Sequence, residues 1–278
     1  MPSSLRAPIG PGSTAKPAAE SSGTVHRLLR ILGCFAERDR WRLGELATAL
    51  GLPGPSAHRL LNLCRPLGFV DQDVDGCYVP GPELYRLAGR LSAEAPLRRL
   101  AIPILESLRD EIQETVMLSV LTRSELGMFF MAVASPAHPL RYTVELNRLQ
   151  SLAWGAAGRS LLAYLGAGEI AEVIRRREPS PLDQRPLSPT DLRRSLADIR
   201  REGVAVTQAQ RSPDTWGIAV PFFDAAGQVH GNFNIAIPDH RFASHDVDDL
   251  VRRLRSAVER LTRGLGWQRT TTSGGSGR

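Results

Sequence analysis

The chain has 278 residues, of which 42% are hydrophobic, 6% aromatic and 23% charged, and its formal net charge is +6. This length is enough for two domains with packed cores. The sequence has no apolar run long enough to span a membrane, and residues 1–22 lack the apolar core of a secretory signal. We therefore expect a cytoplasmic protein that does not bind membranes.

Both ends of the chain are rich in small and polar residues. Residues 1–22 are dominated by Pro, Ser, Ala and Gly, and the chain ends in RTTTSGGSGR. Such segments bury too little apolar surface to fold. We predict disordered tails over residues 1–22 and 268–278.

Residues 23–81 have the pattern of a small helical DNA-binding domain. Apolar residues recur at helical spacing from Thr24, which predicts a helix that buries Val25, Leu28, Leu29, Leu32 and Phe35. A short strand is predicted over residues 41–43. A second helix through ELATAL should end at Gly51, because glycine tolerates the left-handed conformation of a helix C-terminus.

A third helix completes a helix-turn-helix. It is predicted to begin at Pro55 with Gly54 as its N-cap, and to bury Ala57, Leu60, Leu61 and Cys64. Two short helices joined by a glycine-containing turn are typical of this motif, whose second helix enters the major groove of DNA. The candidate DNA-binding residues are Pro55, Ser56, Ala57, His58 and Arg59. Arg59 has an alternative role as a solvated or intradomain ion-pair residue.

A hairpin and a linking helix follow. The β-prone pairs FV and YV flank Asp75-Gly76, a dipeptide that favours hairpin turns, and a hairpin after the second helix of the motif is a wing. Residues 82–96 are predicted to form a linker helix with an apolar side, formed by Leu84, Leu87 and Leu91.

Residues 97–267 mix strands and helices. Helices are predicted at IPILESLRDEI, at WGAAGRSLLAYLG after a glycine loop, at DLRRSLADIRREG with Thr190 as its cap, and from Ser244 onward. Strands are predicted at TVMLSVLT, LGMFFMAVA, LRYTVEL, WGIAVPFFD and QVHGNFNIAI. This order indicates an α+β domain with an antiparallel sheet.

The polar and aromatic residues of this domain suggest a ligand pocket. A pocket needs apolar walls and a few placed polar groups, and such residues occur at strand ends or in the glycine loop, at Trp154, Gly155, Gln210, Asn232 and Asn234. Trp154 could instead be a core residue and the asparagines turn or edge residues. A helix begins at the loop, and its free N–H groups favour a carboxylate. The expected ligand is an organic acid or another polar metabolite.

Metal sites and catalytic motifs are not expected. The three cysteines form no CxxC pair, and Asp239, His240, His245 and Asp246 flank a helix start where acidic caps are common. Ser160 lies in GRSLL without the G-x-S-x-G elbow of hydrolases. We expect no metal, no cofactor and no enzymatic activity.

Four motifs in order resemble the IclR family of bacterial transcription regulators over residues 22–267. They are the run from VHRLLRILGCF to CRPLGFV, then LRRLAIPILESLRDEIQETVMLSVL, then AAGRSLLAYL, and finally LSPTDLRRSLADIRREGVAV with GIAVPFFDAAGQVHGNFNIAIP. The resemblance implies a winged helix-turn-helix, a linker helix and a GAF-like effector domain. It also implies binding to double-stranded operator DNA as a homodimer or homotetramer.

The sequence departs from the family pattern at several positions. Gly54 and Pro55 replace polar residues at the start of the recognition helix, and Arg159 replaces a lysine. Gln210 stands where an acidic residue is common, and Gly217, a further candidate effector-binding residue, stands where some members have a small polar or thiol residue.

Charge keeps a second class of function open. Residues 23–80 carry seven Arg against six Asp and Glu, and three of the acids, Asp71, Asp73 and Asp75, lie in the wing, where basic residues would help to hold phosphate. The alternative is an enzyme or ligand-binding protein whose helix-turn-helix serves only for dimerisation.

Overall fold

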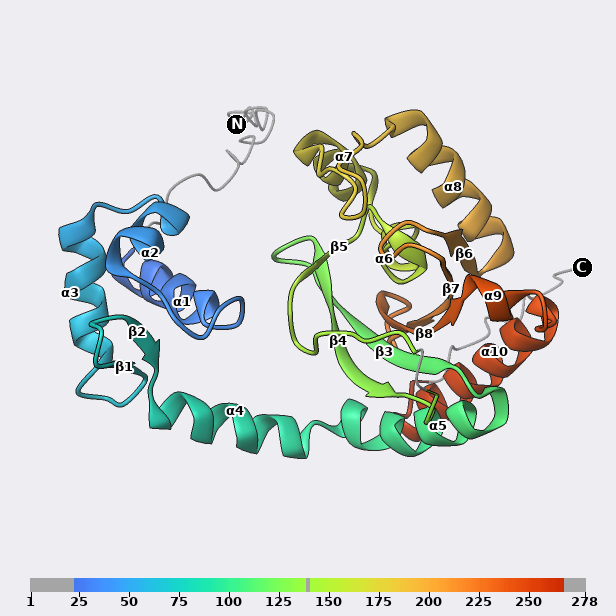
Figure 1. Ribbon diagram of the computed structural model, residues 1–278, viewed down its shortest axis with the longest axis horizontal. Coiled ribbons are helices and arrows are strands. Elements are labelled where there is room, and N and C mark those ends of the chain that lie inside the picture. The colour runs from blue at the N-terminus through green and yellow to red at the C-terminus, as the bar shows by residue number, and fades with distance from the viewer. Residues whose placement is uncertain (1–22, 139–140, 268–278) are drawn as a thin grey trace, which may run out of the picture. The chain divides into compact units, whose positions relative to one another are not determined.

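A computed structural model of the chain describes residues 23–138 and 141–267, so both predicted tails lie outside the described residues. The chain divides into two compact units, Met1–Tyr85 and Arg86–Arg278 (Figure 1). Within the described ranges, no helix is both long and apolar enough to cross a membrane.

The first unit is a winged helix-turn-helix. Its elements in order are α1 (Thr24–Cys34), α2 (Leu43–Leu50), α3 (Gly54–Cys64), β1 (Val70–Gln72) and β2 (Tyr78–Pro80). Gly51 ends α2 in the left-handed region with φ +64°, as its position in the sequence predicts. The core joins all three helices and the wing, at Ile31, Trp41, Leu46, Leu50, Leu60, Leu61, Cys64, Val70 and Tyr78.

Two boundaries in this unit differ from the sequence predictions. Pro53, rather than Gly54, is the N-cap of α3, because proline has the extended ψ that a cap needs and Gly54 already has helical geometry. The strand predicted over residues 41–43 reduces to a single bridge between Trp41 and Tyr78, because α2 already begins at Leu43.

Helix α1 has apolar residues on two sides, whereas the sequence prediction placed them all on one buried face. Ile31 is fully buried, whereas Val25 is 72% and Leu29 is 61% exposed. The prediction that Val25 and Leu29 are buried in this chain is therefore wrong. Among residues 23–85, no further helix or strand covers the second side of α1.

Two acidic residues of the wing form ion pairs with a residue outside it. Arg40, from the segment before α2, forms ion pairs with Asp73 and Asp75. Although burial raises the pKa of Asp73, hydrogen bonds from the Cys77 N–H and from Arg40 lower it below its usual range. The turn itself has Gly76 at φ +74°, as expected for Asp-Gly.

The second unit is built on a six-stranded antiparallel sheet with the strand order β5-β4-β3-β8-β7-β6. The strands are β3 (Thr115–Thr122), β4 (Gly127–Ala134), β5 (Gln150–Ser151), β6 (Ala205–Gln208), β7 (Thr215–Phe223) and β8 (Val229–Pro238). The helices are α4 (Pro82–Glu94), which spans the boundary between the units, α5 (Pro96–Ile112), α6 (Gly155–Leu162), α7 (Ala167–Arg176), α8 (Pro189–Glu202), α9 (Asp239–Phe242) and α10 (Val247–Gly264).

Helices cover both faces of this sheet (Figure 1). Successive residues of a strand point to opposite faces. In β3, Val116, Leu118 and Val120 accordingly belong to the core shared with α5 and α10, whereas Met117 belongs to the core shared with α6 and α8. The predicted α+β architecture is therefore confirmed.

Several element predictions in this unit are wrong. Residues 141–145 are not a strand, and from LRYTVEL only Leu146 makes a bridge, with Phe130. Ser188, rather than Thr190, caps α8, because its Oγ accepts the Asp191 N–H. Asp246 likewise replaces Ser244 as the cap of α10. Helix α7 and the short strands β5 and β6 were not predicted.

The burial of His230 leads to a pH-dependent stability. Its imidazole packs against Trp267 with ring centroids 4.9 Å apart, and burial lowers its pKa below 6.5, although Asp224 opposes the shift. The folded state then binds fewer protons than the unfolded state below pH 6.5. We expect stability to fall as the pH drops through this range. Urea unfolding of the wild type and of His230→Phe should show a weaker decline in the variant, and equal declines would contradict the assignment.

Candidate functional site

Helix α3 presents a polar face at its N-terminal half. Pro55, His58 and Arg59 are exposed and Ser56 is half-buried. Ala57 has no exposed surface, because it packs into the core of the unit, so its assignment as a DNA-contacting residue is wrong. Four of the five predicted residues thus share an accessible surface at the end of the helix that enters DNA in this motif.

Two details refine this surface. Arg59 makes no ion pair with any residue in the described part of the chain, so the intradomain role considered for it has no partner there. Asn62, one turn after His58, lies 3.4 Å from its imidazole nitrogens. Asn62 was missed in the sequence analysis, although its i+4 position relative to His58 is a signal that could have found it.

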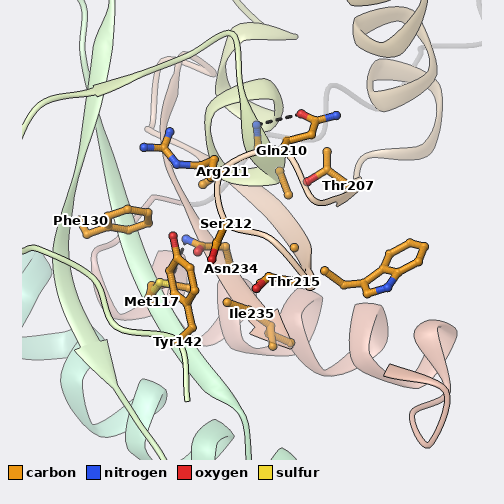
Figure 2. Close-up of a pocket in the computed structure, with 16 residues that line it drawn as sticks. Met117, Phe130, Tyr142, Thr207, Gln210, Arg211, Ser212, Thr215, Asn234 and Ile235 are labelled. Atoms are coloured by element: carbon orange, nitrogen blue, oxygen red, sulfur yellow. Dashed lines mark hydrogen bonds between the residues drawn. The ribbon is translucent and has the colours of Figure 1, made fainter. Parts of the chain in front are cut away.

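A pocket lies in the second unit between the start of α6, the sheet and the segment before β7. It is lined by Met117, Phe130, Tyr142, Gly155, Ala156, Ala157, Thr207, Gln210, Arg211, Ser212, Thr215, Trp216, Gly217, Asn234, Ile235 and Ala236 (Figure 2). The side chains leave about 50 Å³ of free space. A cavity of this size holds roughly four water-sized groups. A small molecule therefore fits without rearrangement, and a larger one requires the side chains to move.

Four of the six predicted effector residues lie in the pocket wall, namely Gly155, Gln210, Gly217 and Asn234. Gly217, on β7, faces α6 so closely that a Cβ there would lie 3.2 Å from Ala156 Cβ. Glycine at this position lets the helix approach the sheet.

The other two predicted residues, Trp154 and Asn232, do not line the pocket. Trp154 is only 4% exposed, and its indole N–H donates to the Glu178 carbonyl at 3.0 Å. Asn232 is fully buried beneath α6, where its Nδ2 donates to the Ala157 carbonyl at 2.8 Å and to Ser160 Oγ at 3.0 Å. Trp154 is a core residue, and Asn232 attaches α6 to β8.

Asn234 connects this buried attachment to the pocket. Its Nδ2 donates to Asn232 Oδ1 at 2.8 Å and to Ser119 Oγ at 2.9 Å. Every donor of the Asn234 amide group is therefore used within the protein, and its carbonyl oxygen is the group left for a ligand.

Gln210 has a structural partner as well. Its Oε1 accepts the Gly155 N–H at 2.9 Å, which the dashed line in Figure 2 marks. The first N–H group of α6 is thereby satisfied by a side chain. The expectation that the N–H groups of this helix start are free for a carboxylate is therefore wrong for the N–H of Gly155.

Arg211 is the charged residue among the pocket residues that the sequence did not predict. Gly155 has φ +78°, and a Cβ at this position would lie 2.5 Å from Arg211 Cδ. The glycine therefore gives space to the arginine side chain, which lies across it. Figure 2 shows this side chain extending towards Phe130. The glycine-rich loop indicates that another group approaches the backbone closely. It does not indicate that this group is the Arg211 side chain.

The pocket is electrostatically positive. Arg211 is the single charged residue among those that line it, and no Asp or Glu is in that set. Burial lowers the pKa of Arg211, while the neighbouring Tyr142 opposes the shift. Burial and the neighbouring Arg185 also lower the pKa of Arg159, to about 10, but Arg159 donates to the Ala153 carbonyl and lies outside the pocket wall.

The residues considered for a metal site make other contacts in the structure. In the described ranges, no group of three or more His, Cys, Asp or Glu side chains is arranged to hold a metal ion. Asp239 instead accepts from Trp216 Nε1 at 2.7 Å, and His245 lies 3.2 Å from Glu114.

Comparison with known proteins gives matches along nearly the whole described chain. The family model described as "IclR helix-turn-helix domain" matches residues 24–74, and "Bacterial transcriptional regulator IclR C-terminal" matches residues 91–263. Among curated relatives, the transcriptional repressor IclR of Escherichia coli is 26% identical over 95% of this chain and 99% of its own. The HTH-type transcriptional regulator KipR of Bacillus subtilis is 24% identical over 88% and 97%.

Solved structures show the same fold. An IclR transcriptional regulator from Silicibacter sp. TM1040 superposes with a TM-score of 0.80 at 25% identity, covering 90% of this chain and 98% of its own. An IclR homologue from Microbacterium hydrocarbonoxydans, complexed with 4-hydroxybenzoate, gives a TM-score of 0.69 at 24% identity, covering 88% and 100%.

Proposed function

The chain belongs to the IclR family of bacterial transcriptional regulators, and we propose that a small molecule in the pocket of its second unit controls its binding to an operator. Family membership makes it a DNA-binding regulator rather than an enzyme. The observation that carries the effector proposal is the partly open, positively charged pocket beside α6. Because operators are chromosomal, we place the protein in the cytoplasm.

The DNA-contacting residues in this proposal are Pro55, Ser56, His58 and Arg59. They share the accessible N-terminal half of α3, the second helix of the motif. Arg59 can hold a phosphate or a guanine edge with two parallel hydrogen bonds. The wing contributes little attraction for phosphate, since Arg40 only partly offsets its acids.

The effector in this proposal is an organic acid or another polar metabolite. The pocket combines apolar walls, such as Met117 and Phe130, with hydroxyl groups of Ser212 and Thr215. This is the composition of sites that take small polar molecules. The structural relative with bound 4-hydroxybenzoate has this fold, which suggests a carboxylic acid as a probe.

We also propose that the protein works as a homodimer or homotetramer. One helix-turn-helix reads only a few base pairs, and dimers bind two half-sites. Two apolar stripes are left exposed by the described residues of the chain. One is Val25 and Leu29 on α1, and the other is Leu87 and Leu91 on α4, which are 39% and 63% exposed.

Replacement of Leu87 and Leu91 with aspartate should dissociate the assembly. Two buried carboxylates in an apolar interface cost more than the contacts contribute. We expect light scattering to give the mass of a dimer or tetramer for the wild type and a lower mass for the double variant. The matched control replaces the exposed Leu63 with aspartate, which should leave the mass unchanged. A monomeric wild type that still binds its operator specifically would contradict the proposal.

A mobility-shift titration with the DNA upstream of the protein's own gene tests the proposed function. We expect specific binding that weakens as salt rises, because phosphate contacts release counterions. Equal affinity for that DNA and for random DNA of the same length would contradict it.

A further inference from the structure

We infer that Arg211 is the residue that recognises the effector, and that it selects a small monoanion over the corresponding neutral molecule. This inference rests on the proposed function of the pocket. Arg211 lies in the segment between β6 and β7, and its side chain enters the pocket over Gly155.

The first argument is the charge balance of the pocket. Its wall includes Arg211 and no carboxylate. In the described ranges, Arg211 forms no ion pair, and its partners are all neutral. They are the Gln150 side chain, Tyr142 and two backbone carbonyls. Burying a cation without a counterion is unfavourable. An anionic ligand supplies the missing counterion, so the site favours an anion.

The second argument is that two of the contacts that hold Arg211 are weak, although its Nη2 also donates to Gln150 Oε1. Its Nη1 lies 3.5 Å from the Ser151 carbonyl and 3.4 Å from the Trp154 carbonyl, at the long limit of hydrogen bonding. A carboxylate would offer two charged acceptors in place of these, with the bidentate geometry that suits guanidinium. The exchange is therefore favourable for an anion and not for a neutral amide.

The third argument is that the backbone is adapted to this side chain. Gly155 adopts φ +78°, and any Cβ would overlap Arg211 Cδ. The N–H of the same residue is fixed by Gln210, the immediate neighbour of Arg211. The loop therefore holds the start of α6 with one side chain and places the cation beside it with the next.

Chemistry also limits the ligand. One guanidinium balances a single negative charge, so a dianion would leave one charge unpaired in the pocket. The hydroxyl groups of Ser212, Thr215 and Thr207 can donate to a second polar group of the ligand. With about 50 Å³ of free space, the ligand that fits without rearrangement is a short hydroxy or keto acid.

The inference is tested with matched pairs of probes on the full-length protein. Acetate, lactate and 4-hydroxybenzoate are compared with acetamide, lactamide and 4-hydroxybenzamide at millimolar concentration, by thermal shift and then by calorimetry. We expect at least one carboxylate to bind and its amide to bind at least about 10-fold more weakly, since charge-assisted hydrogen bonds exceed neutral ones by that order.

Variants then assign the charge to Arg211. Arg211→Gln should weaken carboxylate binding by about 10- to 150-fold, and Arg211→Lys by less, because lysine keeps the charge but loses the fork. Gly155→Ala should weaken it by displacing the arginine. The control is Arg194→Gln, an exposed α8 residue, which should bind like the wild type. Circular dichroism reports whether each variant is folded. If Gly155→Ala does not fold, Arg211→Lys is used in its place.

Three results would overturn the inference: no carboxylate of the panel binds the wild type, an amide binds as tightly as its acid, or Arg211→Gln keeps wild-type affinity. None of them bears on the proposed binding to operator DNA. Ligand-free operator binding by the wild type tests that DNA binding separately, in the mobility shift described above.

Discussion

Arg59→Ala is expected to weaken operator binding by about 1–3 kcal/mol per subunit, and by roughly twice that in a dimer that uses both copies. Arg59 is exposed on the N-terminal half of α3, and no ion-pair partner for it exists in the described part of the chain. The expected loss of operator affinity therefore reports a missing DNA contact, because the substitution leaves no ion-pair partner unpaired in the described part of the protein. Operator titrations at a fixed salt concentration measure it.

The salt dependence of operator binding and the affinity for unrelated DNA distinguish a base contact of Arg59 from a phosphate contact. If Arg59 holds a phosphate, the variant should also lower the slope of log affinity against log salt by about 1, and affinity for unrelated DNA should fall in parallel. If it reads a base, specific binding alone should fall. Arg194→Ala on α8 serves as the control for loss of a surface charge. A folded Arg59→Ala protein with unchanged operator affinity would remove Arg59 from the interface.

Arg241→Met is expected to destabilise the second unit by about 3–5 kcal/mol. Glu114, the residue before β3, is only 2% exposed and receives two hydrogen bonds of 2.7 Å, from Nε and Nη2 of Arg241. His245 adds a third contact at 3.2 Å. Without the guanidinium, the Glu114 carboxylate stays buried with a single partner that is charged only when protonated.

Chemical denaturation measures this loss of stability. A second variant tests whether the unpaired Glu114 carboxylate causes it. The double variant Glu114→Leu/Arg241→Met removes the carboxylate together with its partner, so it should recover much of the lost stability. Replacing the exposed Arg252 with Met controls for the charge change. If Arg241→Met unfolds at the wild-type denaturant concentration, the ion pair contributes nothing and the assignment fails.

The sequence predicts the elements that have local causes. Gly51, the Asp75-Gly76 turn and the apolar spacing in α3 depend on neighbours within a few residues, and each appears where expected. The prediction of a strand at 140–146 is wrong for residues 141–145, because apolar alternation makes a strand only where a neighbouring strand pairs with it. Helix α7 was missed although Glu169 caps it through the Gly166 N–H.

The pocket shows why residue type alone does not define a site. Asn232 and Asn234 lie two apart on β8, so both point to the same face of the sheet. Helix α6 covers the first and leaves the second at the pocket wall. Arg211 could not be distinguished from other loop arginines, because its role depends on lying over Gly155, which is 56 positions earlier in the chain.

One measurement tests the central claim most directly: operator affinity with and without a saturating concentration of the carboxylate that binds best. A ligand changes DNA affinity only by the difference in its affinity for the free and DNA-bound protein. We predict a change of about 5- to 150-fold, with an equal change in ligand affinity when operator is present. Identical operator affinities at full ligand occupancy would contradict effector control through this pocket.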